Sequence, residues 1–550
     1  MANYFHDYAK DRLLDEARIK ELLRLREPEG TDLDALYRDC LARLEQVGQL
    51  AAERVEPRAA AVDDDGAQFH DGSVSYAHGT DENLRDLKEA GLMGVMLPRE
   101  YGGLHLPVTV YSLMTQMLSR ADASLQNLFG LQDIAQTIRL FGSDDQKQRF
   151  LPRFATGEFD GAMALTEPDA GSDLQSVQTS ATLGEDGIWR IRGLKHFITN
   201  GCAKVLLVLA RSEAGTRDAR GLSLFIVQAG PAVVINRIED KLGIHGSPTC
   251  EVQFNDAPAE LLGQRRFGLI KYVMSLMNGA RLAISSQAAG LAEAAQTLAH
   301  AYTAQRSQFG HTLDAIPPVA DMLERIDAIA EAERALLLET CHYVDLRDAY
   351  ELRANANRAD ADARDKAKLY TKVAALMTPL TKFFNTEGAN AVAYDTIQCM
   401  GGKGYMHERI AERYYRDARI MNIYEGTSQM QVVAATGGLM THVIVPIVAD
   451  LFASVADVPG AEATVARLRD AQTLTDETLA LLAQQPSALL ERLARHLLRM
   501  QTIVYVGLLL VRNARRDGDR LALAKAFVRH HLPDLHAARQ AVLLACEDLA

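Results

Sequence analysis

The feature that most constrains the fold is a change of residue pattern in the middle of the chain. Residues 161–264 carry short apolar runs, such as Val205 to Ala210 and Leu222 to Gln228, and a hairpin-type turn from Gly184 to Gly187. These signals predict β-strands that form a compact sheet or barrel. Apolar residues on both sides of this block recur at helical spacing. The chain is therefore predicted to be an α+β protein with a β block between two helical regions.

The pattern predicts four domains. They are an N-terminal helical domain at 1–160, a central β-sheet or β-barrel domain at 161–264, a helical bundle at 265–440 and additional C-terminal helices at 441–550. Residues 59–79 are expected to form a loop or hairpin, and residues 267–306 one long helix. The charged segment 347–368 is expected to be a solvated helix or a mobile connection.

Charge and cysteine content exclude several classes of protein. The net charge of −13 disfavours nucleic acid as the main partner. The six cysteines form no C-x-x-C pair and have no histidine cluster at metal-ligand spacing, so reduced thiols and no metal are expected. The first residues carry charges where a signal peptide needs an apolar run. The run Ile503 to Val511 is shorter than the ~20 residues of a membrane span, and a cytoplasmic location is expected.

Five short segments combine glycine, hydroxyl, aromatic and charged residues in ways that suit binding and chemistry. Taken alone, each has an ordinary interpretation as a turn, a strand end, a helix cap or a surface carboxylate. The fourth has neither the spacing of a P-loop nor that of a dinucleotide-binding loop. The segments are Leu165-Thr-Glu-Pro-Asp-Ala-Gly-Ser-Asp173, Phe197-Ile-Thr-Asn-Gly201, Gln305-Arg-Ser-Gln-Phe-Gly310, Gln398-Cys-Met-Gly-Gly-Lys-Gly404 and Ile423-Tyr-Glu-Gly-Thr-Ser-Gln429.

In this order, the five segments resemble the acyl-CoA dehydrogenase family, from about residue 85 to 435. The resemblance implies an FAD-dependent α,β-dehydrogenation of an acyl-CoA thioester to the 2-enoyl-CoA. A base removes a proton from the α-carbon while a hydride leaves the β-carbon for the flavin N5. Glu425 in Ile-Tyr-Glu-Gly-Thr is the most specific element and is implied to be that base. Its backbone N–H, with a ribityl hydroxyl, would hold the thioester oxygen.

The resemblance also assigns the other site residues. Some members carry the base directly before an arginine of the long helix, but that position is Ala280 here, which cannot take a proton. The following Arg281 would help to orient the site. Ser172, Arg281 and Gly426 are implied to contact substrate. The implied FAD-binding residues are Leu165, Thr166, Ser172, Phe197, Ile198, Thr199, Thr427 and Gln429, with Arg306, Gln308, Phe309, Gln398, Gly401 and Gly402 for the distal half of the FAD of a neighbouring subunit.

Three positions depart from the family pattern. Phe197 stands where the family often has Trp, which reduces ring area but keeps a stacking surface. Gln308 replaces a common Thr, so the hydrogen bond of that residue does not carry over. The sequence Ile316-Pro-Pro-Val319 occupies a stretch where many members have a Gln. Cofactor contacts at this last stretch cannot be transferred.

The resemblance implies an electron-transferring flavoprotein as electron acceptor and a homodimer or homotetramer. Residues 441–550 resemble the added helical domain of larger members, which mediates dimerisation or membrane contact in some of them. Residues 491–550 hold ten Lys and Arg against six Asp and Glu, so a membrane contact is not favoured. Two alternatives remain: an acyl-CoA oxidase, in which oxygen reoxidises the flavin, and a flavoprotein that binds DNA through this C-terminal region.

Overall fold

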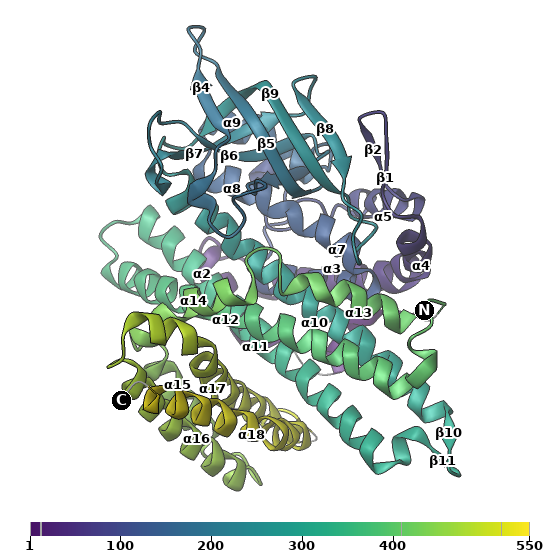
Figure 1. Ribbon diagram of the computed structural model, residues 1–550. Helices are drawn as coiled ribbons and strands as arrows, with labels where there is room; N and C mark the ends of the chain where they lie inside the picture. The colour runs from purple at the N-terminus through teal and green to yellow at the C-terminus, as the bar shows by residue number, and fades with distance from the viewer. Residues whose placement is uncertain (1, 11–13, 409, 519, 549–550) are drawn as a thin grey trace. The chain divides into compact units, whose positions relative to one another are not determined.

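The computed structural model describes residues 2–10, 14–408, 410–518 and 520–548 and divides into two compact units. The first unit comprises Met1–Tyr4 and Leu44–Gln287, and the second comprises Phe5–Arg43 and Ala288–Ala550. Figure 1 shows the large sheet in the first unit and helices in both. The predicted α+β class is confirmed, with a helical N-terminal part, a central sheet, a helical bundle and extra C-terminal helices. The four domain ranges stay a prediction.

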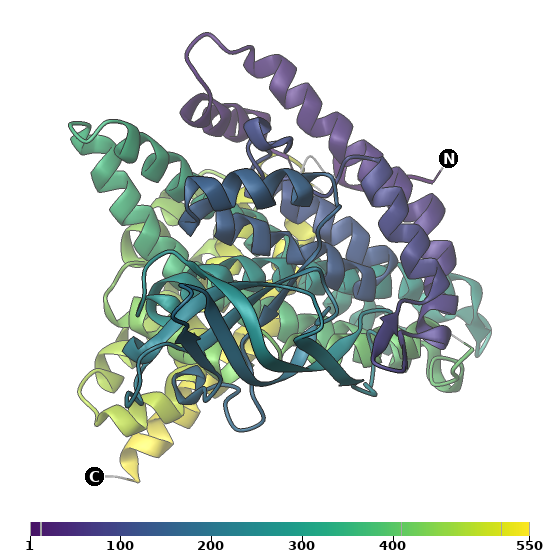
Figure 2. The ribbon, with the colours of Figure 1, turned by 90° about the horizontal axis from the view of Figure 1, so that it is seen from above.

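The first unit contains the predicted β block as one sheet, drawn in teal and blue in Figures 1 and 2. Its order is β3-β6-β4-β5-β9-β7, with β8 on β9, and a further β6–β7 pairing closes the path into a barrel-like ring. Strands β6 and β7 consist mostly of apolar residues, and almost every residue in them is buried. The strands are β3 Gly161–Ala164, β4 Ser180–Leu183, β5 Trp189–Thr199, β6 Val205–Arg211, β7 Leu222–Gln228, β8 Val233–Ile238 and β9 Thr249–Leu262.

Helices precede the sheet in the first unit. Ser143 caps α9 in a reciprocal capping box with Gln146, which fixes where that helix begins. The prediction of a loop or hairpin at 59–79 was wrong for its first part. Ala59 and Val62 are buried, so α4 continues to Asp65, and the hairpin spans only β1 Gln68–His70 and β2 Ser73–Ser75. The helices are α4 Glu56–Asp65, α5 His78–Glu89, α6 Val108–Ala121, α7 Ala123–Phe129, α8 Asp133–Phe141 and α9 Asp144–Ala155, with α3 Leu33–Leu50 before them.

The segment predicted as one long helix at 267–306 begins differently. A π-helical turn, Gly268–Val273, precedes the regular helix α10, Met274–Gln305. The backbone of Gly268 lies against that of Ser223, because a Cβ at this position would stand 2.5 Å from the Ser223 carbonyl carbon. A π turn holds one residue more than an α turn, and it is found here where the chain approaches the sheet closely.

The second unit is built on two long helices, α11 Pro317–Ala356 and α12 Ala361–Met400. The charged segment predicted as a solvated helix or a mobile connection is mostly helical, with only 357–360 between the two helices. Gly401 ends α12 with a φ of 60°, as its glycine-rich sequence predicts. The other helices are α1 Tyr4–Lys10, α2 Glu16–Arg26, α13 Ile410–Met421, α14 Ser428–Met440, α15 Val445–Val455, α16 Glu462–Leu482, α17 Ser487–Ala514 and α18 Arg520–Glu547.

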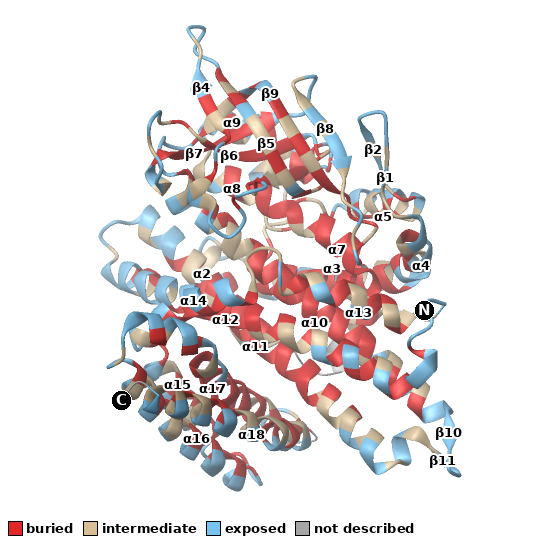
Figure 3. Ribbon diagram, viewed as in Figure 1, coloured by how far each residue is buried: buried red, intermediate tan, exposed pale blue. Residues whose placement is uncertain are grey.

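Helix α17 is the centre of the C-terminal addition, and Figure 3 shows it mostly red, as buried. Among the described residues it alone is a single helix long and apolar enough to cross a membrane, but 83% of that apolar window is buried within the protein. The bent pair α14 and α15 passes the same test jointly. At its end, Arg512 binds the buried carboxylate of Glu339 at 2.7 Å. Burial raises the pKa of Glu339, but Arg512 and Arg18 outweigh this effect and hold it below its usual range.

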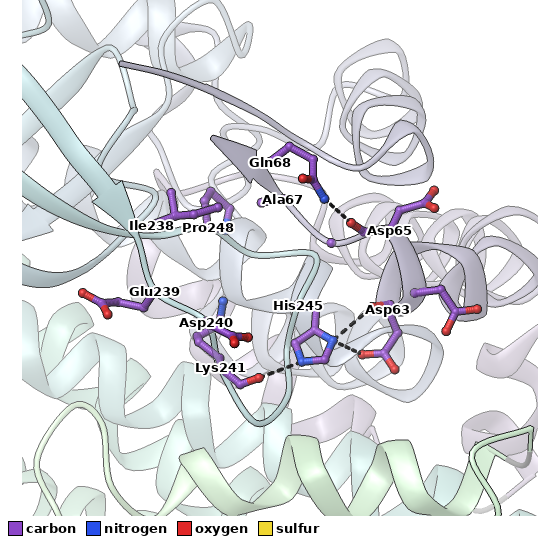
Figure 4. A pocket seen from close by; sticks show the side chains of 12 residues that line it. Asp63, Asp65, Ala67, Gln68, Ile238, Glu239, Asp240, Lys241, His245 and Pro248 are labelled. Carbon is purple, nitrogen blue, oxygen red and sulfur yellow. Dashed lines mark hydrogen bonds and ion pairs between the residues drawn. The ribbon is translucent and has the colours of Figure 1, made fainter. Parts of the chain in front are cut away.

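A cavity of about 380 Å³ lies in the first unit between the end of α4 and the segment that joins β8 to β9 (Figure 4). His245 stands at its edge and connects the two sides. Its Nδ1 lies 3.0 Å from the Asp63 carboxylate, and its Nε2 lies 2.9 Å from the Lys241 carbonyl oxygen. The hydrogen bond to Asp63 raises the pKa of His245 to about 9. None of the residues predicted to bind FAD or substrate lines this cavity.

His245 is expected to make the stability of the protein depend on pH. Its folded pKa of about 9 exceeds the ordinary 6.5. The contribution is therefore fully present below pH 6.5 and is lost as pH rises through about 9. Because the pair is partly exposed, we expect His245→Gln to cost about 1–2 kcal/mol at pH 6 and little at pH 10. Chemical denaturation at the two pH values measures this, and an equal loss at both would contradict it.

Candidate active site

The loop between α13 and α14 carries Glu425 in an unusual backbone conformation. Glu425 has a φ of 55°, a left-handed value that costs a residue with a side chain roughly 1–2 kcal/mol. Its side chain is half-buried. The next residue, Gly426, has a φ of 89°, and a Cβ there would stand 2.7 Å from the Gln431 side-chain nitrogen. The positive φ favours glycine at position 426, and a side chain there would also displace the Gln431 amide.

Two side chains hold this loop in place. The ammonium of Lys382, fully buried on α12, donates to the carbonyls of Met421 at 3.0 Å and Gly426 at 2.8 Å. The amide of Gln431, on α14, donates to the carbonyls of Glu425 at 3.2 Å and Gly426 at 2.8 Å. Bonds from a charged donor are worth about 1.5–3 kcal/mol each, which exceeds the backbone strain. The conformation of Glu425 is thus imposed by its surroundings.

The remaining predicted residues of the second unit fall into three places. Thr427 caps α14 by accepting from the Met430 N–H, and Gln429 is exposed in the first turn of that helix. Gln398 lies at the end of α12, next to Gly401 and Gly402, where an added Cβ would meet nothing within 4 Å. Arg306, Gln308 and Phe309 belong to or flank the small hairpin β10 Ser307–Gln308 and β11 His311–Thr312. Phe309 is 91% exposed at its tip.

In the first unit, the structure brings the two predicted flavin segments together. The backbone N–H of His196, on β5, donates to the Thr166 carbonyl at 2.9 Å. The Lys195 ammonium donates to the Leu165 carbonyl at 2.8 Å. Leu165 is buried, Thr166 is half-buried, and Ser172 is exposed farther along the same loop. The loop 165–173 therefore lies beside the end of β5, as binding of one ligand by both segments requires.

A β-bulge near the end of β5 turns Phe197 outward. Lys195 pairs with Val252 and Ile198 with Cys250, so two residues of β5 face one residue of β9. Phe197 has a φ of 60°, is 58% exposed and stacks on His196 with ring centroids 4.0 Å apart. Ile198 is buried and Thr199 is half-buried. The bulge thus presents an aromatic face beside the loop 165–173.

Arg281 lies in the first half of α10 and is buried. Its Nη1 donates to the Asn278 side-chain oxygen at 3.0 Å, and its carbonyl accepts from the Ser285 hydroxyl at 2.7 Å. The preceding Ala280 is also buried. Its burial distinguishes Arg281 from an arginine on a solvated helix face. Its proposed role toward substrate stays a prediction.

An ion pair that was not predicted from the sequence holds the loop 165–173. Lys195 is fully buried and binds the Glu167 carboxylate at 2.9 Å, and Glu167 also accepts from the N–H groups of Gln178 at 2.7 Å and Thr179 at 2.9 Å. Burial lowers the pKa of Lys195 to about 8, so the ammonium is charged at neutral pH. The alternation of residues along β5 could have revealed this buried lysine, because Lys195 lies on the same face of the strand as the buried Trp189 and Ile191.

An ionic cluster lies behind Phe197. His196 Nε2 is 2.8 Å from the Glu239 carboxylate and 3.7 Å from that of Glu251. Three such ligands at this spacing could hold a metal ion. The guanidinium of Arg237, however, lies 3.0 Å from the same His196 nitrogen and 3.4 Å from each carboxylate. The arginine already supplies the positive charge, so the cluster is an ion-pair network.

We expect Lys195→Met to destabilise the protein by about 3–5 kcal/mol, because it leaves the Glu167 charge buried and without its ammonium. FAD binding should weaken with it, since the loop 165–173 loses its anchor. The double variant Lys195→Met/Glu167→Gln should recover part of the loss, because it removes the buried charge while the single amide oxygen still accepts from one of the two backbone N–H groups. Thermal denaturation and FAD titration test this. A double variant no more stable than Lys195→Met would contradict it.

The chain matches all three parts of one family. The "Acyl-CoA dehydrogenase, N-terminal domain" matches residues 40–158, the "middle domain" residues 162–257, and the "C-terminal domain" residues 270–436. A relative from Ruegeria pomeroyi, 3-methylmercaptopropionyl-CoA dehydrogenase, is 34% identical over 423 residues, which cover 72% of this chain and 69% of that protein.

Solved structures agree. Butyryl-CoA dehydrogenase from Megasphaera elsdenii is 28% identical, with a TM-score of 0.63 over 75% of this chain and 100% of that one. An acyl-CoA dehydrogenase complexed with FAD, from Bacillus anthracis, is 23% identical and shows the same fold, including the C-terminal addition. Its TM-score is 0.79 over 97% of this chain and 91% of that one. The chain is a member of the acyl-CoA dehydrogenase family, an oxidoreductase that uses FAD.

Proposed function

We propose that Glu425 is the base that removes the α-proton of a bound acyl-CoA. The observation that supports this proposal is the conformation of its loop. A carboxylate in a disfavoured φ region, imposed by Lys382 and Gln431, is the kind of strain that persists at functional sites. Strain of this kind fixes where the carboxylate stands before substrate arrives, which lowers the cost of reaching the reactive geometry.

The residues present fit an FAD. Phe197 offers a partly exposed ring on the bulge of β5, and the loop 165–173 offers backbone and hydroxyl groups beside it. Gly401 and Gly402 leave open space for close backbone approach. Leu165, Thr166, Phe197, Ile198 and Thr199 would hold the ring side. When bound, FAD supplies the acceptor for the hydride that leaves the substrate β-carbon.

The chain itself must lower the cost of removing a weakly acidic α-proton. In this proposal the Glu425 backbone N–H donates to the thioester oxygen, where negative charge develops as the proton leaves. Gly426 gives the substrate close access to that backbone, since it carries no side chain. Arg281 and Ser172 are proposed to orient the thioester and the CoA. Exclusion of water by the acyl chain then makes the carboxylate a stronger base.

We further propose that the protein acts as a homodimer or homotetramer. The tip of the β10–β11 hairpin projects Phe309, 91% exposed, with Arg306 and Gln308 exposed beside it. An aromatic ring and a guanidinium of this kind suit the adenine and diphosphate of an FAD held by another subunit. An electron-transferring flavoprotein is the proposed electron acceptor. The cytoplasmic location also stays a proposal.

We expect Glu425→Gln to retain FAD but to slow its reduction by every acyl-CoA by roughly 100-fold or more, because an amide cannot accept the proton. Anaerobic titration with acyl-CoA thioesters of varied chain length and branching, followed by bleaching of the flavin absorbance, measures this. Glu477→Gln, a change at an exposed carboxylate of α16 that pairs with Arg539, is the control and should reduce like the parent protein.

Bleaching of the Glu425→Gln protein at near-parental rates would remove Glu425 from the mechanism. The lifetime of the reduced flavin in air separates the dehydrogenase from the oxidase alternative. A dehydrogenase with acyl product bound should stay reduced for minutes, whereas an oxidase should reoxidise at once. Binding to a DNA duplex that weakens steeply with salt would support the DNA-binding alternative instead.

A further inference from the structure

We propose that Glu387 is a positioning residue that couples the C-terminal helical addition to the loop of Glu425. This inference rests on the proposed function, because it concerns the geometry of the proposed base. It assigns residues 441–550 a role toward the loop of Glu425, distinct from the dimerisation or membrane contact that the resemblance to larger members suggests. All the groups involved lie within the second compact unit.

Glu387 joins both ends of the catalytic loop. Its Oε1 accepts from the Ser428 hydroxyl at 2.5 Å and from the Asn422 side-chain amide at 3.3 Å. The loop closes on itself between the same two residues, since the Ser428 N–H donates to the Asn422 carbonyl at 3.0 Å. Glu425 lies midway between them. One carboxylate oxygen therefore links Asn422 and Ser428, the two ends of the segment that contains Glu425.

The second oxygen of Glu387 faces the C-terminal addition. Its Oε2 accepts from Nη2 of Arg495, on α17, at 2.9 Å. The Arg495 guanidinium also lies 5.6 Å from the centre of the Phe383 ring, one turn earlier on α12. Arg495 and Ser428 thus bind different oxygens of the same carboxylate. A carboxylate bound at both oxygens has few alternative rotamers, so its position is defined by α17 as well as by its own helix.

Glu387 complements the anchor made by Lys382. Lys382 lies five residues earlier on α12 and binds the carbonyls of Met421 and Gly426, while Glu387 binds side chains at positions 422 and 428. The two residues are a cation and an anion that hold the segment 421–428 by different groups. Lys382 belongs to the core of the bundle, whereas Glu387 is the member that the C-terminal addition can reach.

The stability of the protein should depend little on this ion pair. The side chain of Arg495 is 53% exposed and that of Glu387 is 32% exposed, and pairs of this kind add little to folding. The ion pair is expected instead to affect the ordering of residues 422–428.

Helix α17 provides a matched control: Arg499 binds Asp534 at 2.7 Å, with side-chain exposures of 51% and 38%. That pair joins α17 to α18, and within the described part of the chain it forms no hydrogen bond or ion pair with residues 422–428.

The test uses the full-length, FAD-loaded protein and the variants Arg495→Met and Arg499→Met. Methionine keeps an apolar stem but removes the guanidinium that binds Glu387. We expect Arg495→Met to speed amide hydrogen exchange of residues 422–428 by about tenfold, the factor that corresponds to one ordinary hydrogen bond. Arg499→Met should leave exchange there unchanged, and both variants should unfold at nearly the parental temperature.

Kinetics give a second measurement. In Arg495→Met, the rate of flavin reduction at saturating acyl-CoA should fall by about three- to tenfold, with a smaller effect on half-saturation, because the base and its backbone N–H are misplaced while the proposed substrate contacts outside residues 422–428 remain. Arg495→Lys should restore part of the rate. In a double-mutant cycle, adding Arg495→Met to Glu387→Ala should cause no further increase in exchange, since the two act through one contact.

Unchanged exchange in Arg495→Met, or an equal increase in Arg499→Met, would overturn the coupling. Those results leave the assignment of Glu425 untouched. If Glu425→Gln reduces flavin normally while Arg495→Met still loosens residues 422–428, the coupling stands and Glu425 is not the base. The two proposals therefore fail in different experiments.

Discussion

A buried ammonium that binds two backbone carbonyls is the interaction on which the proposed site depends. Lys382 reaches from the middle of α12 to the carbonyls of Met421 and Gly426, at the two sides of Glu425. Without such a donor, the carbonyls of this turn would have to find other partners or lie unpaired in the interior. The left-handed φ of Glu425 would then relax at no cost. The position of one carboxylate is thus a property of the long helix behind it.

A buried lysine also binds a loop carbonyl in the first unit, but there the lysine is paired with a carboxylate. There, Lys195 also lies fully buried and also binds a backbone carbonyl, that of Leu165, but Glu167 neutralises it. In both places an irregular segment that carries the proposed chemistry is fixed by an ammonium from a regular element. Loops of this kind cannot be held by apolar packing alone, because their backbone groups need specific partners.

The sequence predicted the order of helical and β regions, the glycine that ends α12 and the family, because local patterns and short motifs carry that information. It did not predict Lys382 or Glu387 as anchors, because their partners lie about 40 residues away along the chain and nothing local marks them. The extension of α4 to Asp65 and the π turn at Gly268 were also missed. The first depends on burial of Ala59 and Val62, and the second on contact with Ser223. The roles of the individual site residues remain predictions.

The bulge in β5 has a consequence for how this surface can vary between proteins. In a regular strand, neighbouring side chains point to opposite faces, yet His196 and Phe197 stack against each other because two residues share the place of one. The histidine is tied to Glu239, and the ring that it supports faces outward. A larger ring at 197 would therefore rest on the same imidazole without any change in the ladder. Substitution at 197 can alter the area of this exposed aromatic surface independently of the barrel beneath it.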